Sequence, residues 1–349
     1  MAIRPAMKLL GLDLVDGWKA IKLIEPKSTD TGSCFSVGYI VRNNDGKEAF
    51  LKALDYSRAL QSDDPAKELQ KLTERFNFER TLLDKCRNKH MSKIVTAIAH
   101  GKITVPGESS EHGVVQYIVF EKADGNIRQL YNLSKNIDTT WCLRSLHNSA
   151  VALQQLHTHG IAHQDLKPSN VLVFAKDQEF KVADLGRASD KAVPFHYDEM
   201  QIAGDPSYAP IELEYNFRIS DEFQRKYGID MYHLGSLIFF YFSDVSATEA
   251  IKTKLTKSLN TSKEGKGFTE DLPYIRYAFI EAVNDLRKDV FDKAEDLTDE
   301  IINIVQELCE PDPSKRGHPL DRVNNPYSLE RYITSFDRLA EKAEVRLSK

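Results

Sequence analysis

Two aspartates, a lysine and an asparagine carry side chains that could together transfer a phosphoryl group. Asp165, Lys167 and Asn170 lie close together just before a short apolar run, and Asp184 follows Asp165 by nineteen residues. Oxygens such as those of Asn170 and Asp184 are the hard ligands that Mg²⁺ prefers. The ammonium of Lys167 suits a transferring phosphoryl group, and Asp165 is placed to orient a hydroxyl and accept its proton.

The elements that must position these residues begin with a strand-rich first third. Strand-like apolar runs, separated by turn signals, lie at 20–24, 37–41, 49–54, 94–98 and 114–120. The Asp-Gly step in Asn43–Gly46 predicts a hairpin between the second and third runs. After the third run, residues 65–88 carry apolar side chains at helical spacing and predict one long helix.

The remainder of the chain is predicted to be mainly helical. Helical periodicity is present at 141–159, 228–242, 274–294, 298–309 and 327–347, and a polar surface loop is predicted at 258–268. A strand-rich part followed by a helical part predicts an α+β fold whose two lobes meet near Lys122. The predicted divisions are an N-terminal extension (1–17), a small lobe (18–122), a large lobe (123–322) and a C-terminal helical tail (323–349).

Composition and charge narrow the classes of function. The 349 residues include 47 basic and 52 acidic side chains, and the net charge of −5 without a long basic run does not favour a nucleic-acid partner. The longest apolar run, Leu237–Phe242, is less than half of the roughly 20 residues that a membrane-spanning helix needs. No signal-peptide pattern is present at the N-terminus. The four cysteines lie far apart without a C-x-x-C pair, which favours a reducing, cytoplasmic location over disulfides or a zinc site.

Five motifs follow one another in the order of the eukaryotic-like (Hanks-type) serine/threonine protein kinase family, which this chain resembles. They are H-x-D-x-K-P-x-x-N at His163–Asn170, D-x-G at Asp184–Gly186, the end of an activation segment at Gly204–Glu212, the start of a central helix at Asp230–Gly235, and a late arginine motif at Pro311–Arg316. The resemblance covers roughly residues 18–322. It implies a bilobal protein-kinase-like fold with a small antiparallel β-sheet lobe and a larger, mainly α-helical lobe. It also implies ATP and Mg²⁺ as cofactors and a protein as the substrate.

The resemblance assigns roles to individual residues around the phosphates. The catalytic positions match Asp165 and Lys167, and the metal positions match Asn170 and Asp184. Lys52 matches the lysine that positions the α- and β-phosphates. Its helical partner is assigned to Glu79, with Glu68 and Glu74 as rivals.

The resemblance also assigns an adenine site. Backbone groups of Glu121 and Ala123 would meet the edge of the adenine, and Leu172 would form its floor. The family usually has valine at the position of Gly38 and alanine at that of Phe50, so small and large residues have changed places here. Because cores tolerate swaps that conserve volume, Phe50 is predicted to form the roof over the space left by Gly38.

Three further positions depart from the family pattern. Ser36 stands where the last glycine of the phosphate loop is expected, and Gly32 is the nearby glycine upstream of it, assigned to nucleotide binding. Gln164 replaces an arginine that in the family receives a phosphate from the activation loop, which favours a kinase that is active by default or switched by a partner. Asp205 replaces a threonine and could either pair with Lys167 or repel Asp165.

Other conspicuous residues receive structural interpretations. Arg316 is predicted to pair with Glu212, and His163 to brace the loop that carries Asp165. The spacing of His163 from the two histidines before it fits a helix end and a turn rather than a zinc site. In the tail, the residues predicted to dock the last helix are Tyr332, Phe336 and Leu339.

The resulting hypothesis is an ATP-dependent protein kinase that transfers the γ-phosphoryl group to serine or threonine hydroxyls, including its own. The Lys167-Pro168 step favours these acceptors over tyrosine, again by resemblance. One alternative is a pseudokinase, a scaffold that binds nucleotide or a partner without turnover. A third, less favoured because the activation-segment ending and the late arginine motif argue against it, is a small-molecule kinase of the aminoglycoside phosphotransferase type.

Overall fold

The structure is a computed structural model that describes residues 4–25, 35–108, 113–133, 138–194, 200–259 and 267–347. Contacts between residues separate the chain into two compact units. Unit 1 comprises Met1–Asp124 with Asp184–Gly186, and unit 2 comprises Gly125–Ala183 with Arg187–Lys349. Gly32 and most of the predicted loop at 258–268 lie outside the described residues.

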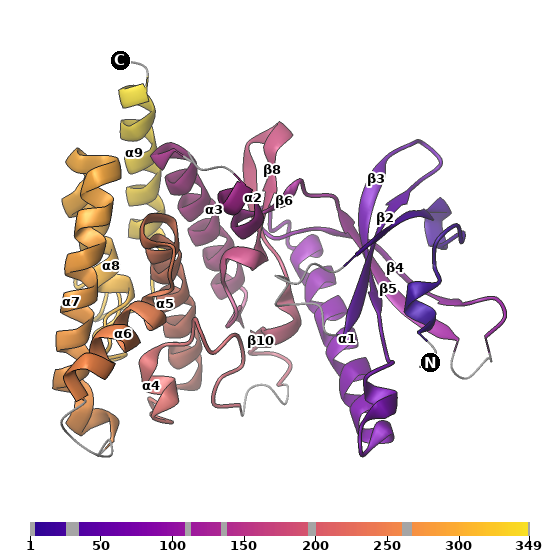
Figure 1. Ribbon diagram of the computed structural model, residues 1–349, viewed down its shortest axis with the longest axis horizontal. Helices are drawn as coiled ribbons and strands as arrows, with labels where there is room; N and C mark the ends of the chain where they lie inside the picture. The colour runs from indigo at the N-terminus through magenta and orange to yellow at the C-terminus, as the bar shows by residue number, and fades with distance from the viewer. Residues whose placement is uncertain are drawn as a thin grey trace. The chain divides into compact units, whose positions relative to one another are not determined.

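Unit 1 is built on a five-stranded antiparallel sheet with the strand order β1-β2-β3-β5-β4. The strands are β1 (Lys19–Ile24), β2 (Ser36–Arg42), β3 (Glu48–Leu54), β4 (Ala97–Thr104) and β5 (Val114–Glu121). One long helix, α1 (Pro65–Asn88), lies beside this sheet (Figure 1). The helix begins where predicted because the side chain of Asp64 accepts a hydrogen bond from the Lys67 N–H and Pro65 fits the first helical position.

The strand predicted at 94–98 is placed wrongly. Ile94 and Val95 are buried, but the Ile94 N–H donates to the Met91 carbonyl in a turn, and the strand begins at Ala97 and extends to Thr104. The apolar signal therefore came in part from buried residues just before the strand. The true strand was masked because its second half is polar and contains Gly101.

Alternate residues of the sheet in unit 1 face its hydrophobic core. In β2 these are Val37, Tyr39 and Val41, so Gly38 and Ile40 face the opposite side of the sheet. The N-terminal segment covers the core face: Leu9 is fully buried, and its N–H donates to the Tyr39 hydroxyl, which donates to the Ala6 carbonyl at 2.7 Å.

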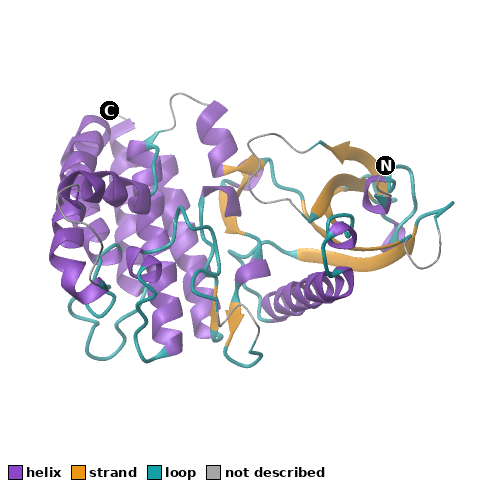
Figure 2. Cartoon of the chain, turned by 60° about the horizontal axis from the view of Figure 1, so that its bottom comes forward, coloured by secondary structure: helices purple, strands orange, loops and turns teal. Residues whose placement is uncertain are grey.

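Unit 2 is mainly helical, as Figure 2 shows. Its helices are α2 (Ile127–Leu133), α3 (Thr139–Thr158), α4 (Ile211–Glu214), α5 (Glu222–Ser243), α6 (Ala247–Leu259), α7 (Phe268–Ala294), α8 (Thr298–Leu308) and α9 (Glu330–Leu347). Short strands form one antiparallel sheet of β6 (Gly125–Asn126), β8 (Val171–Phe174) and β9 (Glu179–Val182), and another of β7 (Ile161–Ala162) and β10 (Ser189–Asp190). The predicted α+β class, a sheet-based first part and a helical second part, is confirmed.

Two helices of unit 2 determine how its core is formed. Helix α5 is buried on all sides from Gly228 to Phe242, as expected for a helix at the centre of a core. The predicted docking of α9 is confirmed, since Tyr332, Phe336 and Leu339 are buried and Arg144 of α3 bonds to Asp337 at 2.6 Å. Helices α2 and α4 were not predicted because each is too short to show a helical period, and α6 was not predicted because it is largely polar. In the described part of the chain, no helix is long and apolar enough to cross a membrane.

Candidate active site

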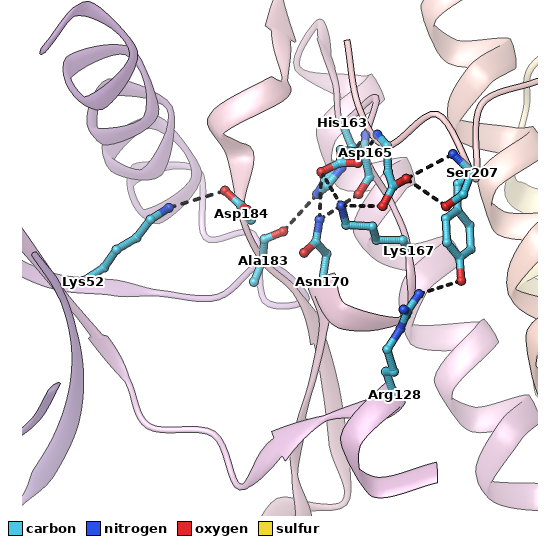
Figure 3. A network of polar contacts seen from close by, with 11 residues as sticks. Lys52, Arg128, His163, Asp165, Lys167, Asn170, Ala183, Asp184 and Ser207 are labelled. Carbon is cyan, nitrogen blue, oxygen red and sulfur yellow. Dashed lines mark hydrogen bonds and ion pairs between the residues drawn. The ribbon is translucent and has the colours of Figure 1, made fainter. Parts of the chain in front are cut away.

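In unit 1, a lysine on β3 pairs with a glutamate on α1. The Lys52 ammonium lies 2.9 Å and 3.1 Å from the two carboxylate oxygens of Glu79, and 3.4 Å from Oδ1 of Asp184 (Figure 3 shows the contact with Asp184). Burial alone would lower the pKa of Lys52, but the carboxylates of Asp184 and Glu79 outweigh it and raise this pKa above its usual 10.5. The ammonium is therefore permanently charged and held by two carboxylates.

The structure selects Glu79 over the two rival glutamates of the same helix. Glu79 is buried, whereas Glu68 bonds to Lys71 at 2.6 Å and Glu74 accepts from Gln70 at 2.7 Å on the exposed face. Helical periodicity explains the choice, because Glu79 lies on the buried face of the helix with residues such as Phe76 and Leu83.

Gly186 leaves little space for a side chain beside Asp184. Asp184 has a positive φ of 63°. A Cβ atom added to Gly186 would lie 3.2 Å from Asp184 Oδ1 and 3.2 Å from the guanidinium of Arg75 on α1. The D-x-G spacing thus lets the chain pass close to two charged side chains.

In unit 2, the loop before β8 gathers three of the predicted residues. The Lys167 ammonium lies 3.3 Å from Asp165 Oδ2. The amide nitrogen of Asn170 donates to the Asp165 carbonyl at 2.8 Å and to Asp165 Oδ2 at 3.3 Å. These bonds, part of the network in Figure 3, orient the Asn170 amide so that its oxygen is directed away from Asp165. An oxygen donor oriented in this way fits a hard cation such as Mg²⁺.

A buried aspartate on α5 accepts hydrogen bonds from the backbone of the same loop. Asp230 Oδ1 accepts from the Gln164 N–H at 2.7 Å, and Oδ2 accepts from the His163 N–H and from His157 Nε2, both at 2.8 Å. Burial alone would raise the pKa of Asp230, but the hydrogen bond and charge of His157 and the Gln164 N–H outweigh it and lower this pKa below 3.8. The bonds from the backbone N–H groups of His163 and Gln164 to Asp230 hold Gln164 at a positive φ of 61°.

His163 braces this loop, as predicted. Its Nε2 lies 3.0 Å from the Ala183 carbonyl, and its Nδ1 accepts from the Asp165 N–H at 3.2 Å. Both ring nitrogens are therefore engaged within unit 2. Among the described residues, no group of three or more histidines, cysteines and carboxylates is arranged to hold a metal ion.

Asp205 pairs with the lysine rather than repelling the neighbouring aspartate. Its Oδ2 accepts from Lys167 at 3.2 Å, and its backbone N–H donates to Asp165 Oδ1 at 2.8 Å. Its Oδ1 accepts from the N–H and the hydroxyl of Ser207 at 3.0 Å and 2.8 Å. Burial raises the pKa of Asp205, but the Ser207 bonds and the Lys167 charge together bring it below its usual 3.8.

The predicted pair of Arg316 and Glu212 is confirmed as a buried ion pair. The guanidinium donates to both carboxylate oxygens of Glu212, at 2.8 Å and 3.0 Å, and to the Gly228 carbonyl at 3.2 Å. Two parallel bonds of this kind fix both partners, so the end of the Gly204–Glu212 segment is tied to the helical core of unit 2.

Comparison with known proteins agrees with this geometry. The profile described as "Protein kinase domain" matches residues 31–328. The chain belongs to the protein kinase family. It is 37% identical over 92 residues to cyclin-dependent kinase B2-1 of Arabidopsis thaliana and 31% identical over 157 residues to the Wee1-like protein kinase of the same plant. It is also 31% identical over 115 residues to the probable serine/threonine-protein kinase PknB of Lactococcus lactis.

These similarities are partial on both sides. The matched segments cover 25%, 43% and 33% of this kinase-family chain in the order given above. They cover only 29%, 27% and 18% of those relatives' own lengths. The comparisons therefore establish the family, while the activity and substrate of this kinase require a separate argument.

The residues assigned to the adenine fall in both units of the kinase domain. In unit 1, a Cβ atom added to Gly38 would lie 3.0 Å from Phe50 Cε2, so the exchange of small and large residues is present. Glu121, at the end of β5, uses its backbone N–H and its carboxylate to bond with Thr96. Ala123 follows in unit 1, and Leu172 lies on β8 of unit 2. Their contact with adenine remains a prediction.

Sequence reasoning missed two groups close to the predicted residues. Asp230 was recognised only as the start of a motif, and its role as acceptor for the loop that carries Asp165 follows from the fold. Arg75 was not singled out, although it lies one helical turn before Glu79 on the same face of α1. That spacing was the signal that could have found it.

Proposed function

We propose that this chain is an active ATP-dependent protein kinase that phosphorylates serine or threonine hydroxyls. The observation that carries the proposal is the ion pair of Lys52 and Glu79, whose atoms lie 2.9 Å and 3.1 Å apart. Protein kinases require this lysine–glutamate pair in place for turnover, because it positions the phosphates of the nucleotide. A scaffold that binds no nucleotide has no need of this arrangement.

The remaining residues divide the work of phosphoryl transfer. Lys52 would bind the α- and β-phosphates, and Lys167 would neutralise charge that develops on the γ-phosphoryl group. Asp165 would accept a hydrogen bond from the substrate hydroxyl and then its proton, a contribution on the order of 10²–10⁴ to the rate. The bonds from Asp205 and Asn170 support this role, because they fix both carboxylate oxygens of Asp165.

Mg²⁺ would be held by Asn170 and Asp184. The oriented amide oxygen of Asn170 and the carboxylate of Asp184 suit a hard cation. When bound, the metal would neutralise charge on the phosphates of ATP.

The adenine and acceptor assignments are part of the same proposal. Serine and threonine are favoured because Lys167 is followed by Pro168, as in the family's serine/threonine members. The PknB similarity, to a protein named as a probable serine/threonine kinase, supports this acceptor class. Besides Lys52 and Glu79, the residues proposed to contact the nucleotide are Gly32, Phe50, Glu121, Ala123 and Leu172.

Phosphate transfer from radiolabelled ATP to the chain itself and to a generic basic protein tests the proposal. We expect incorporation by the wild type, loss of more than about 10²-fold in Asp165→Ala and Asp184→Asn, and loss on chelation of Mg²⁺. Nucleotide affinity is measured in parallel by calorimetry. A wild type that binds ATP but transfers no phosphate in the presence of Mg²⁺ would identify a scaffold instead.

A further inference from the structure

An arginine on helix α2 reaches the segment that contacts the proposed catalytic aspartate. Arg128 Nη2 donates to the Tyr208 hydroxyl at 2.9 Å, and its guanidinium carbon lies 5.9 Å from the centre of that ring (Figure 3 shows the bond from Arg128). The Tyr208 N–H donates to the Asp205 carbonyl, and the Asp205 N–H donates to Asp165 Oδ1. Four residues of unit 2 are thus linked in a continuous series from Arg128 to Asp165.

The positive charge of Arg128 has no acidic partner in the described part of the chain. Of the five N–H donors that an arginine carries, one of the two on Nη2 bonds to Tyr208, and the buried Nε has no partner among the described residues. Burial raises the pKa of Tyr208 to about 12, so the hydroxyl that receives this bond stays neutral at physiological pH. The bond therefore leaves the guanidinium charge uncompensated.

Comparable arginines of unit 2 show what such a side chain ordinarily contacts. Arg144 bonds to Asp337 at 2.6 Å and to Glu344 at 3.0 Å, and Arg276 bonds to Glu310 at 3.1 Å and to Asp312 at 3.0 Å. A partly buried guanidinium without a carboxylate loses hydration without full compensation. A bound anion would therefore compensate the charge of the Arg128 guanidinium.

We propose that Arg128 selects protein substrates that carry an acidic side chain close to the acceptor hydroxyl. The proposal rests on the proposed kinase activity, because the linkage to Asp165 places Arg128 near the residues that flank an acceptor. Guanidinium groups bind carboxylates and phosphates through paired N–H bonds, which gives both strength and direction. Asp205, an acidic group of the same segment, does not compete, since Lys167 and Ser207 already occupy its oxygens.

The test compares serine peptides that differ at one flanking position. A glutamate is moved one position at a time along either side of the serine in a neutral background, and kcat/KM is compared with that of peptides carrying alanine or lysine there. We expect a preference of about tenfold for glutamate over alanine at the best position, the typical value of one charge-assisted bond. A phosphoserine in place of the glutamate distinguishes a phosphate ligand from a carboxylate.

Three variants separate a specific role from a structural one. Arg128→Gln should reduce the glutamate-to-alanine ratio to about one, and Arg128→Glu should favour lysine. Arg144→Gln, which removes an equally charged but paired arginine, should keep the tenfold ratio. Retention of the full ratio in Arg128→Gln, or no glutamate preference at any position in the wild type, would overturn the proposal.

Binding measurements keep the inference separate from the activity. Fluorescence anisotropy of labelled glutamate and alanine peptides reports the preference of the wild type even without turnover. If no peptide is phosphorylated but glutamate peptides bind about tenfold more tightly, the proposed activity fails while the role of Arg128 stands. If all peptides are phosphorylated equally and bind equally, the proposed activity stands and the proposed role of Arg128 fails. If an Arg128 variant does not fold, the glutamate-to-alanine ratio of the wild type still tests the proposed preference for acidic substrates.

Discussion

Lys167 donates to Asp205 at 3.2 Å, so the lysine expected to meet the γ-phosphoryl group is shared between two carboxylates. The second carboxylate comes from a segment forty residues after Asp165. Asp205 also fixes Ser207 and the position of its own N–H toward Asp165. Asp205 therefore acts as a positioning residue for the proposed catalytic pair, in a place where the family usually has a threonine.

Replacing Asp205 by alanine should lower kcat by about tenfold with little change in the KM for ATP. The Lys167 ammonium would then keep its contact with Asp165 and lose the one with Asp205. The N–H and hydroxyl of Ser207 would lose the carboxylate that accepts their hydrogen bonds. Steady-state phosphorylation of a peptide measures both constants. Asp205→Asn is the matched control, because it keeps an acceptor for Ser207 and removes only the charge, and it should have an intermediate effect. An increase in kcat for either variant would show instead that Asp205 withholds Lys167 from the phosphate.

The acid stability of the fold should depend on Asp205. Its pKa is lower in the folded protein than the usual 3.8, with the Ser207 bonds and the Lys167 charge outweighing the effect of burial. A carboxyl group with a lowered pKa stabilises the fold above its unfolded pKa, and this stabilisation is lost as the pH falls through the folded value. The free energy of unfolding of the wild type minus that of Asp205→Asn should be constant above about pH 5 and shrink below about pH 4. Urea unfolding at several pH values measures it, and a difference unchanged down to about pH 3 would contradict the prediction.

Replacing Glu79 by glutamine should reduce kcat/KM for ATP by about 10–100-fold, the range expected when an ion pair becomes a weaker hydrogen bond at a site that positions phosphates. Glutamine still offers Lys52 a neutral oxygen, but the carboxylate that remains beside the ammonium is that of Asp184, at the longer distance of 3.4 Å. Initial rates at limiting ATP give the ratio. Glu74→Gln on the exposed face of the same helix is the control and should have nearly the wild-type value. Equal effects of the two substitutions would mean that the ion pair does not position the nucleotide.

Sequence predicted those features that depend on neighbours in the chain. The long helix of unit 1 was placed from Pro65 to Asn88 because its cap, its first proline and its apolar period are all local. Lys52 and Glu79 were paired from motif order, and their contact across 27 residues agrees with that assignment.

Features that depend on tertiary packing could not be read in this way. Asp230 contacts His163 across 67 residues, and Arg128 contacts Tyr208 across 80 residues. No periodicity or motif spacing encodes which backbone N–H groups an aspartate will accept from, or which arginine will lack a carboxylate. The same limit applies to β4, where burial of Ile94 in a turn imitated a strand.

The exchange of sizes between Gly38 and Phe50 should make their substitutions interdependent. A Cβ atom at residue 38 would already lie 3.0 Å from Phe50 Cε2, so Gly38→Val should destabilise unit 1 by about 1–3 kcal/mol through overpacking. Phe50→Ala opens space beside residue 38, and the double variant should regain much of the lost stability because valine fills that space. Urea unfolding of the wild type, both single variants and the double variant gives the coupling energy.

The same four proteins test the proposed adenine roof. Phe50→Ala alone should weaken ATP binding by about tenfold, since the ring would no longer cover the adenine, and Gly38→Val in that background should restore most of the affinity. Calorimetric titration with ATP measures each value. Strictly additive free energies of unfolding would show that residues 38 and 50 pack independently. ATP affinity unchanged by Phe50→Ala would instead place the adenine away from this ring.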